Sequence, residues 1–409
     1  MKIGILTYYC VPNFGAQLQC ISTIGYLKSI GHEPFVIHWY PLDLEDMYSK
    51  RIPAEQVQMH MRFAEHNMPL TKLCRTEDDV VKEIERLQID AVFAGSDALF
   101  KYVPESDRVV FSKRRLRFVR NKICSVENLG NVFQGGFLSK ISRKLKAVAF
   151  SVSSQNCPYF RMNENEKRVI KECMNNYSKI STRDEWTRDM VQTITGKNDI
   201  DITPDPVFAF NQNNFLILPE KKEILKRYSL PENYVLFSFW QNRLPNGYLK
   251  NMAKLFQKKG LVPVALPVPE TLNDCGLDNS INLPLSPIDW YALIIYSKGY
   301  VGERMHPIVV ALHNAVPFFN FDSYRTFKKT FWGFRKQYIT DSSKTYHILK
   351  SAELDKYRYS YLDKSKLPDA DEVVQKVLEF PVDFCKSFAE KQQQKYNSAM
   401  KKILSAFEG

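Results

Sequence analysis

The sequence predicts an α/β protein of two lobes, each a mainly parallel β-sheet covered by helices, followed by a C-terminal helical tail. Apolar strand segments alternate with helical patterns along most of the chain, as in parallel sheets with crossover helices. A Pro- and Asn-rich segment, TPDPVFAFNQNN, interrupts this alternation near residue 210. The length of 409 residues also exceeds what one ordinary core fills, so two domains are expected.

The first half of the chain opens with a β-α-β pattern. KIGILTY at residues 2–8 is an apolar strand, and residues 15–30 place apolar side chains at helical spacing before Gly31. PFVIHW at 34–39 predicts the second strand. Further strands are predicted at 90–94, 147–151, 178–182 and 200–203, with helices at 76–88, 162–176 and 184–194.

The second half repeats this alternation. Strands are predicted at 234–240, 261–266, 299–302 and 317–321, with helices at 246–259, 288–297 and 307–315. We therefore expect an N-terminal lobe at 1–210, a C-terminal lobe at 211–345 and a helical tail at 346–409. Two such halves predict a GT-B-like pair of Rossmann-like lobes, with the active site in the cleft between them at the carboxyl ends of the strands.

A basic insertion breaks the first half at about 101–146. Within 113–146 there are ten basic residues and one acid, a net charge of +9 out of +12 for the whole chain, interleaved with apolar residues. A solvated charged loop is the default interpretation. Nucleic-acid binding is not expected, because no recognised motif surrounds the segment. Binding to an anionic membrane surface fits best, and its candidate residues are Arg114, Arg115, Arg117, Arg120, Arg143 and Lys144.

The composition excludes several other classes. No apolar run reaches the ~18 residues that a membrane span needs. The start, MKIGILTYYC, lacks the regions of a signal peptide, so we expect a cytoplasmic protein. Eight scattered cysteines form no CxxC pair, which predicts reduced, mostly buried thiols. No compact metal-ligand cluster is evident, and no metal site is predicted.

The segment GYVGERMHPIVVALHNAVPFFNFD at 299–322 carries the most informative pattern. A predicted strand ends at Gly302 and a helix opens at Pro307, so Arg304 and His306 lie in the turn between them. Free backbone N–H groups at a helix start favour anions, arginine adds a forked donor for phosphate or carboxylate, and histidine can transfer a proton near neutral pH. Purely structural roles for both side chains stand as an equal alternative.

Other candidate residues follow predicted strands at their carboxyl ends. In chain order they are Asn13, Gly15, Gln17, Ser96, Asp97, Arg183, Asp184, Glu185 and Glu303. Close packing explains the glycine equally well, and helix capping explains the serine and the acids. Beside two prolines, Asp205 is expected to build a turn, and a role in supporting an arginine is left open.

These segments resemble, in order, the polysaccharide pyruvyl transferase family. R-x-H with the apolar helix and strand that follow it looks like the C-terminal signature of the family, and NFGAQLQ at 13–19 is similar to its first loop. DAVFAGSDALF, KISTRDEWT and TPDPVF resemble three further family segments. Together the matches span about residues 3–322. Leu99-Phe100 departs from the aromatic residue that the family commonly shows soon after GSD, and the basic insertion and the tail lie outside the resemblance.

The resemblance implies an enzyme that moves a pyruvyl group from phosphoenolpyruvate (PEP) to two hydroxyls of a glycan sugar, forming a ketal and releasing phosphate. Arg183 and Arg304 would then hold PEP from opposite lobes, and His306 would supply a proton. Asp97 and Asp184 are candidates for the base. No cofactor is implied. The acceptor is expected on a polyprenyl diphosphate, in capsule or exopolysaccharide assembly, at the inner face of the cytoplasmic membrane.

Two other functions stay open. A nucleotide-sugar-dependent glycosyltransferase on the same fold would bind UDP or GDP in the C-terminal lobe, where Glu303 is the nearest acid for a ribose. A non-catalytic basic protein would bind nucleic acid or an anionic membrane through residues 113–146. Thermal stabilisation by PEP or by nucleotides separates the first of these from the pyruvyltransferase.

Overall fold

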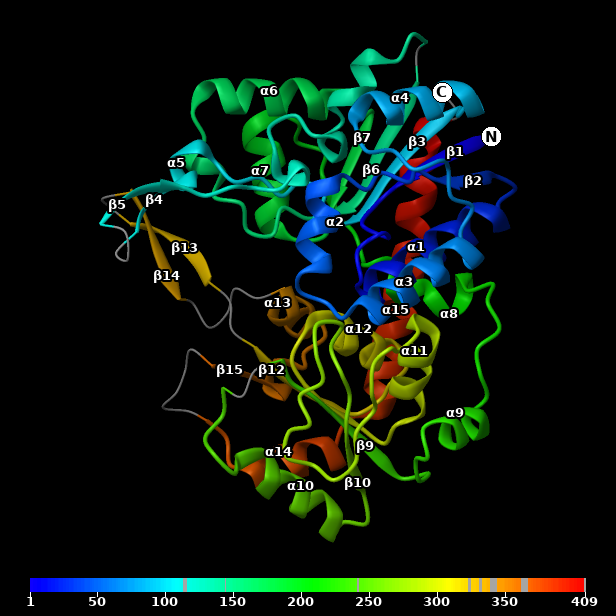
Figure 1. The fold of residues 1–409 in the computed structure, drawn as a ribbon, viewed down its shortest axis with the longest axis vertical. Coiled ribbons are helices and arrows are strands. Elements are labelled where there is room, and N and C mark those ends of the chain that lie inside the picture. Colours follow the sequence, from blue (N-terminus) through cyan, green and yellow to red (C-terminus); the bar gives the residue numbers. More distant parts are fainter. Residues whose placement is uncertain are drawn as a thin grey trace.

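The computed structural model describes residues 1–112, 116–143, 145–240, 243–322, 325–330, 333–338, 344–361 and 367–407. The chain forms two α/β lobes, one above the other in Figure 1, and the last long helix runs between them. This arrangement confirms the predicted two-lobe architecture.

The N-terminal lobe contains a six-stranded parallel sheet. Its strands are β1 (Lys2–Leu6), β2 (Glu33–Val36), β3 (Ala91–Asp97), β6 (Lys146–Val152), β7 (Lys179–Thr182) and β8 (Asp201–Ile202), in the order β2-β1-β3-β6-β7-β8. Its helices are α1 (Phe14–Ser29), α2 (Leu42–Ser49), α3 (Ala54–Asn67), α4 (Glu77–Leu87), α6 (Glu164–Asn175) and α7 (Glu185–Thr195). The central strands are buried on both faces, which explains their continuous apolar runs.

The C-terminal lobe repeats this topology. Its sheet has the order β10-β9-β11-β12-β15, from β9 (Tyr234–Ser238), β10 (Val262–Ala265), β11 (Tyr300–Gly302), β12 (Phe318–Asp322) and β15 (Arg358–Ser360), all parallel. Its helices are α10 (Tyr248–Lys258), α11 (Pro287–Tyr296), α12 (Met305–His313), α13 (Lys344–Ser351) and α14 (Ala370–Leu378). The link between the lobes contains η5 (Pro206–Ala209), α8 (Phe210–Asn213) and α9 (Lys221–Arg227).

The predicted helical tail at 346–409 needs correction, because it is divided between the lobes. Strand β15 completes the C-terminal sheet, and α14 packs against α10 and β12. Helix α15 (Val382–Leu404) returns to the N-terminal lobe and contacts β6, β7 and η5. There the ring of Tyr396 is fully buried against Tyr26 and Phe150. A three-residue strand has too few residues to reveal an alternating pattern in the sequence.

The insertion at 101–146 lies outside the main sheet, as predicted. It contains α5 (Glu105–Arg108), an antiparallel pair of β4 (Val109–Ser112) and β5 (Arg117–Arg120), and the short helices η1 (Ser125–Glu127), η2 (Val132–Gln134) and η3 (Gly136–Lys140). A second hairpin, β13 (Arg325–Thr330) with β14 (Gly333–Tyr338), was not predicted. Both hairpins lie on the same side of the molecule, at the left in Figure 1.

Helix α1 is buried on every side because it lies between the two lobes. Every residue from Phe14 to Leu27 is buried, a pattern typical of an interior helix. Phe14 stacks on Trp290 of the C-terminal lobe, with 5.1 Å between ring centroids. The amide of Gln56 pairs with the backbone of Leu285, donating at 2.8 Å and accepting at 2.7 Å. These contacts join α1 and α3 of the N-terminal lobe to the C-terminal lobe.

Among the described residues, no helix is long and apolar enough to cross a membrane. All eight cysteines are free thiols in the structure and seven of them are buried, which confirms the prediction that the cysteines are mostly buried. Burial raises the pKa of most of these thiols, to about 12 for Cys10.

Candidate active site between the lobes

The two sheets reverse their strand order at equivalent places, between β1 and β3 in the N-terminal lobe and between β9 and β11 in the C-terminal lobe. Open α/β sheets bind ligands at such switch points, outside the carboxyl ends of the strands. Asn13 follows β1 and Asp97 is the last residue of β3, whereas Glu303 and Arg304 follow β11. The sequence candidates thus gather at both switch points.

The two switch points touch at Gly15 and His306. A Cβ atom added to Gly15 would lie 2.1 Å from Cγ, 2.4 Å from Nδ1 and 2.5 Å from Cβ of His306. No larger residue fits at this position without movement of the imidazole. His306 lies in the first turn of α12, and Gly15 lies in the first turn of α1. The first turns of two helices from opposite lobes therefore meet at one imidazole ring.

Arg304 holds a strained backbone conformation directly before α12. Its φ is 77° and its ψ is 147°, a region that non-glycine residues rarely adopt. Its guanidinium lies 2.9 Å from a carboxylate oxygen of Glu270 and 5.2 Å from the ring centre of Trp240. Two-fifths of the side chain stays exposed. The side chain of Arg304, at the cap position, makes no hydrogen bond to the start of α12, and free N–H groups at a helix start favour an anion.

Glu303 is buried beside Arg304 and accepts a hydrogen bond from the backbone N–H of Trp240 at 2.9 Å. This bond joins the loop after β9 to the loop after β11. Through this hydrogen bond, Glu303 supports the C-terminal switch point. The predicted contact between Glu303 and substrate stays a prediction.

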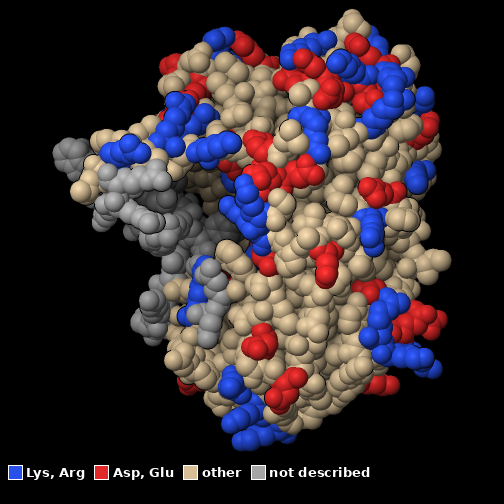
Figure 2. Space-filling view, in the orientation of Figure 1, with Lys and Arg blue, Asp and Glu red and all other residues tan. Residues whose placement is uncertain are grey.

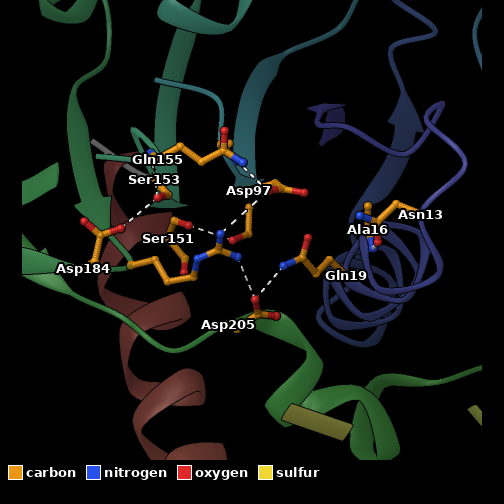
Figure 3. A network of polar contacts seen from close by, with 12 residues as sticks. Asn13, Ala16, Gln19, Asp97, Ser151, Ser153, Gln155, Asp184 and Asp205 are labelled. Atoms are coloured by element: carbon orange, nitrogen blue, oxygen red, sulfur yellow. Dashed lines mark hydrogen bonds and ion pairs between the residues drawn. The ribbon is translucent and has the colours of Figure 1, made fainter. Parts of the chain in front are cut away.

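Arg183 forms a buried ionic network with Asp97 and Asp205, two acids that Figure 3 labels. Its guanidinium lies 2.8 Å from Asp205 and 3.7 Å from Asp97, and only 6% of its side chain is exposed. Burial disfavours the charge, but the carboxylates of Asp205, Asp97 and Asp184 outweigh burial and raise the pKa of Arg183. The ion pair with Arg183 confirms that Asp205 supports an arginine, and the bond that Asp205 accepts from the N–H of Val207 at 3.0 Å confirms the predicted turn. Asp205 also accepts a hydrogen bond from Gln19 at 2.6 Å. Three carboxylates of its own lobe thus balance the charge of Arg183, and its predicted contact with PEP stays a prediction.

Asp97 and Asp184 both belong to the polar network drawn in Figure 3. Asp97 has φ of 104°, a second strained position at the site. Asp184 caps α7 by accepting from the N–H of Thr187 at 2.7 Å and also accepts from the hydroxyl of Ser153 at 2.8 Å. Capping, the alternative left open by the sequence, therefore describes Asp184.

Three predicted binding residues have structural partners instead of open surface. Gln17 is fully buried, and its amide donates to the backbone oxygens of Tyr9 and His60. Ser96 is buried and donates to the backbone oxygen of Ser151 at 2.7 Å. Asn13 caps α1 by accepting from the N–H of Ala16 at 3.2 Å. Of these three, only Asn13 keeps partial exposure.

A cavity of about 730 Å³ lies between the lobes beside this network. Its walls come from the ends of β7 and β8, from Met305 at the start of α12, and from α13 and α15. The surface in Figure 2 is hollowed between the lobes, with basic side chains gathered beside the hollow. The size is typical of a small-ligand pocket.

His347 of α13 lines this cavity, and the sequence analysis missed it. Desolvation lowers the pKa of His347, while the carboxylates of Asp184 and Glu185 act in the opposite direction. It lies in a segment beyond the family resemblance, and a lone histidine in a short helical pattern carries no signal. A neutral imidazole can both donate and accept a hydrogen bond.

The comparison with protein families decides the identity of the chain. The model of the family described as "Polysaccharide pyruvyl transferase" matches residues 13–323. The chain belongs to the polysaccharide pyruvyl transferase family. The match begins at the cap of α1 and ends after β12, so it includes both switch points, Arg304 and His306. Membership makes the chain a pyruvyl transferase that acts on polysaccharide.

Solved structures confirm the GT-B-like fold of this family member. UDP-GlcNAc 2-epimerase from Methanocaldococcus jannaschii is 12% identical with a TM-score of 0.53, and the match covers 93% of each chain. The UDP complex of Arabidopsis thaliana UGT89C1 is 9% identical with a TM-score of 0.53, covering 99% of each chain. UDP-GlcNAc 2-epimerase from Neisseria meningitidis is 9% identical with a TM-score of 0.52, covering all of both chains. No curated protein matches the sequence.

The basic residues predicted to face a membrane are divided among different environments. Arg114, Arg115 and Lys144 lie outside the described residues. Arg117 is exposed, but Arg120 pairs with Glu105 at 2.6 Å and Arg143 donates to the backbone oxygen of Ile89. In the described part of the chain, no three His, Cys, Asp or Glu side chains are grouped to hold a metal ion.

Proposed function

We propose that this pyruvyl transferase moves a pyruvyl group from PEP to two hydroxyls of a glycan sugar, forming a pyruvate ketal and releasing phosphate. The contact between Gly15 and His306 carries this proposal, because it sets a proton-transfer group where the switch points of both lobes meet. The family membership supports the pyruvyl group as the cargo.

In this proposal Arg304 and the start of α12 bind the anionic end of PEP. Arg304 keeps an exposed guanidinium face beside its pair with Glu270, and the first N–H groups of α12 add donors. A carboxylate or phosphate of PEP can join or displace Glu270, which is itself partly exposed. The strained backbone of Arg304 fits a residue held for binding.

His306 then supplies the proton that the enol ether requires. Protonation of the PEP methylene carbon makes C2 electrophilic, and a sugar hydroxyl attacks it. Phosphate leaves, and a second hydroxyl of the sugar closes the ketal. Of the two hydroxyl protons, one ends in the new methyl group and the other leaves with phosphate. Arg183 keeps Asp97 and Asp205 in place around this centre.

We also propose that the acceptor is carried on a polyprenyl diphosphate, as part of capsule or exopolysaccharide assembly at the inner face of the cytoplasmic membrane. The β4–β5 hairpin supports this location, because Leu116 is 79% exposed and Phe118 is 72% exposed beside the exposed Arg117. Exposed apolar side chains among basic ones suit an anionic lipid surface.

The test is thermal unfolding of the purified protein with PEP, UDP or GDP. A ligand that binds only the folded state at a hundred times its Kd adds about 2.7 kcal/mol of stability. We expect PEP to raise Tm, the nucleotides to leave it unchanged, and Arg304→Ala to abolish the PEP shift. Arg188→Ala is the matched control, since Arg188 is a surface residue paired with Asp189. A shift with UDP or GDP and none with PEP would support the nucleotide-sugar glycosyltransferase instead.

A further inference from the structure

The 730 Å³ cavity adjoins the proposed PEP site but has different walls. Met305 lines it, whereas Arg304 and His306 are absent from its described lining. Its other side reaches Arg183, which pairs with Asp97 of the central network. The cavity therefore meets the site of pyruvyl transfer at two points without being part of it.

The lining of this cavity combines hydroxyl-binding groups with aromatic rings. Asp184, Glu185 and His347 supply acceptors and a titratable ring, and His347 senses the charge of both acids. Tyr346 and Phe388 add aromatic surface. Sugars are bound in this way, with hydrogen bonds to hydroxyls and apolar contact to the ring faces.

Two lysines add positive charge to the same cavity. Lys350 comes from α13 and Lys395 comes from α15, so two separate elements supply them. Neither forms an ion pair with any carboxylate of the residues that the structure describes. Lys350 lies over the ring of Tyr346, 5.7 Å from its centre. Asp184, Glu185 and Asp205 also line the cavity, but no described carboxylate lies within ion-pair distance of either lysine, which leaves both ammonium groups available to an anionic group on the ligand.

We propose that this cavity binds the acceptor, a sugar that carries a phosphate or carboxylate group, with its hydroxyls toward His347 and Asp184 and its anionic group at Lys350 and Lys395. The identification of the ligand as the acceptor rests on the proposed function. The evidence for a binding site comes from the residues that line the cavity and does not depend on that function. The anionic group is either a phosphodiester to a carrier or the carboxylate of an acidic sugar, and the two share the same recognition by lysine.

The groups around His347 keep it suitable for a hydroxyl at neutral pH. Desolvation lowers its pKa, Lys350 and Arg358 act in the same direction, and Asp184 and Glu185 oppose them. The imidazole therefore titrates below its ordinary range, which leaves a lone pair to accept a hydrogen bond from a sugar hydroxyl.

The experiment measures binding of glucose 1-phosphate, glucuronate, glucose and inorganic phosphate to the full chain by calorimetry, with saturating PEP present and absent. We expect at least one of the anionic sugars to bind about tenfold more tightly than glucose, and Lys350→Ala and Lys395→Ala each to weaken it about tenfold. Lys391→Ala is the matched control, because Lys391 is exposed on the same helix and is not a lining residue. Preference for glucose 1-phosphate indicates a phosphate-linked acceptor, and preference for glucuronate indicates an acidic sugar.

A second variant separates the two ends of the site. His347→Phe should weaken glucose and the anionic sugars by the same factor, whereas the lysine variants should leave glucose binding unchanged. Equal affinity for glucose and both anionic sugars, or equal effects of Lys350→Ala and Lys391→Ala, would overturn the proposal. Failure of PEP to stabilise the protein would refute the proposed function, but lysine-dependent sugar binding would still establish the cavity as a site.

Discussion

Gly15→Ala tests whether the contact between the lobes positions His306. The new Cβ would lie 2.1 to 2.5 Å from three atoms of the imidazole side chain, whereas carbon atoms in contact stay about 3.5–4.0 Å apart. The ring must therefore move by more than about 1 Å. A displacement of that size typically costs about 100-fold in rate, or about 2.7 kcal/mol of transition-state stabilisation. We expect kcat for PEP-dependent phosphate release to fall by about this factor.

The stability of the same variants gives the decisive control. Overpacking in the native background should reduce the free energy of unfolding by about 1–3 kcal/mol. His306→Gly removes the three atoms nearest to the new Cβ, so Gly15→Ala in that background should instead gain about 0.5–1 kcal/mol from helix propensity. His306→Ala retains the Cβ at 2.5 Å and should rescue only in part. An equal loss of stability in all three backgrounds, measured by urea unfolding, would show that the contact does not determine the effect.

Three further predictions concern the ionic network, the pH dependence and the surface. Asp205→Asn should cost about 3–5 kcal/mol in urea unfolding, because it leaves a buried guanidinium undercompensated, whereas Asp201→Asn, at an exposed pair, should cost at most about 1 kcal/mol. Burial lowers the pKa of His60 to about 4. The free energy of unfolding should therefore be at its full value above about pH 6.5 and should fall by about 3 kcal/mol as the pH is lowered toward 4, because the unfolded chain binds the proton first. His60→Gln should flatten the dependence of unfolding free energy on pH in that window. Leu116→Asp should weaken sedimentation with phosphatidylglycerol vesicles, and Ile217→Asp, which replaces a 95% exposed apolar residue in the link between the lobes, should not.

Long apolar elements were predictable because they are buried on both faces. The strands at 90–94 and 147–151 became β3 and β6, each extended by a few residues. Strand β15 could not be predicted, since three residues pair with β12 through backbone bonds and an ion pair between Arg358 and Asp322 at 2.7 Å. A periodic pattern of apolar residues arises when one face of a helix or strand is buried over several residues. A short element at the edge of a sheet has too few residues to show such a pattern.

The site was predictable to the level of its position and not of its partners. Arg304 and His306 lie between a strand and a helix, and the apolar strand pattern before them and the helix signals after them predict this position. The partners Glu270 of Arg304 and Asp205 of Arg183 are 34 and 22 residues distant, and no local pattern encodes such pairs. Gln17 shows that a correctly placed residue can still have another role. It lies beside the predicted binding loop, but its amide donates hydrogen bonds inside the protein.

The two sheets have the same strand order around their switch points, so the two lobes build their halves of the site in the same way. In each lobe, residues outside the centre of the site support a residue at the switch point. Each lobe contributes one strained residue at its own switch point, Asp97 with φ of 104° and Arg304 with φ of 77°. Each strained residue has a charged partner within its own lobe, Arg183 for Asp97 and Glu270 for Arg304. The lobes then meet at Gly15 and His306, where no side chain separates them. Loss of Asp205 should therefore disturb Asp97 through Arg183 and reduce activity more than it alters the C-terminal half of the site.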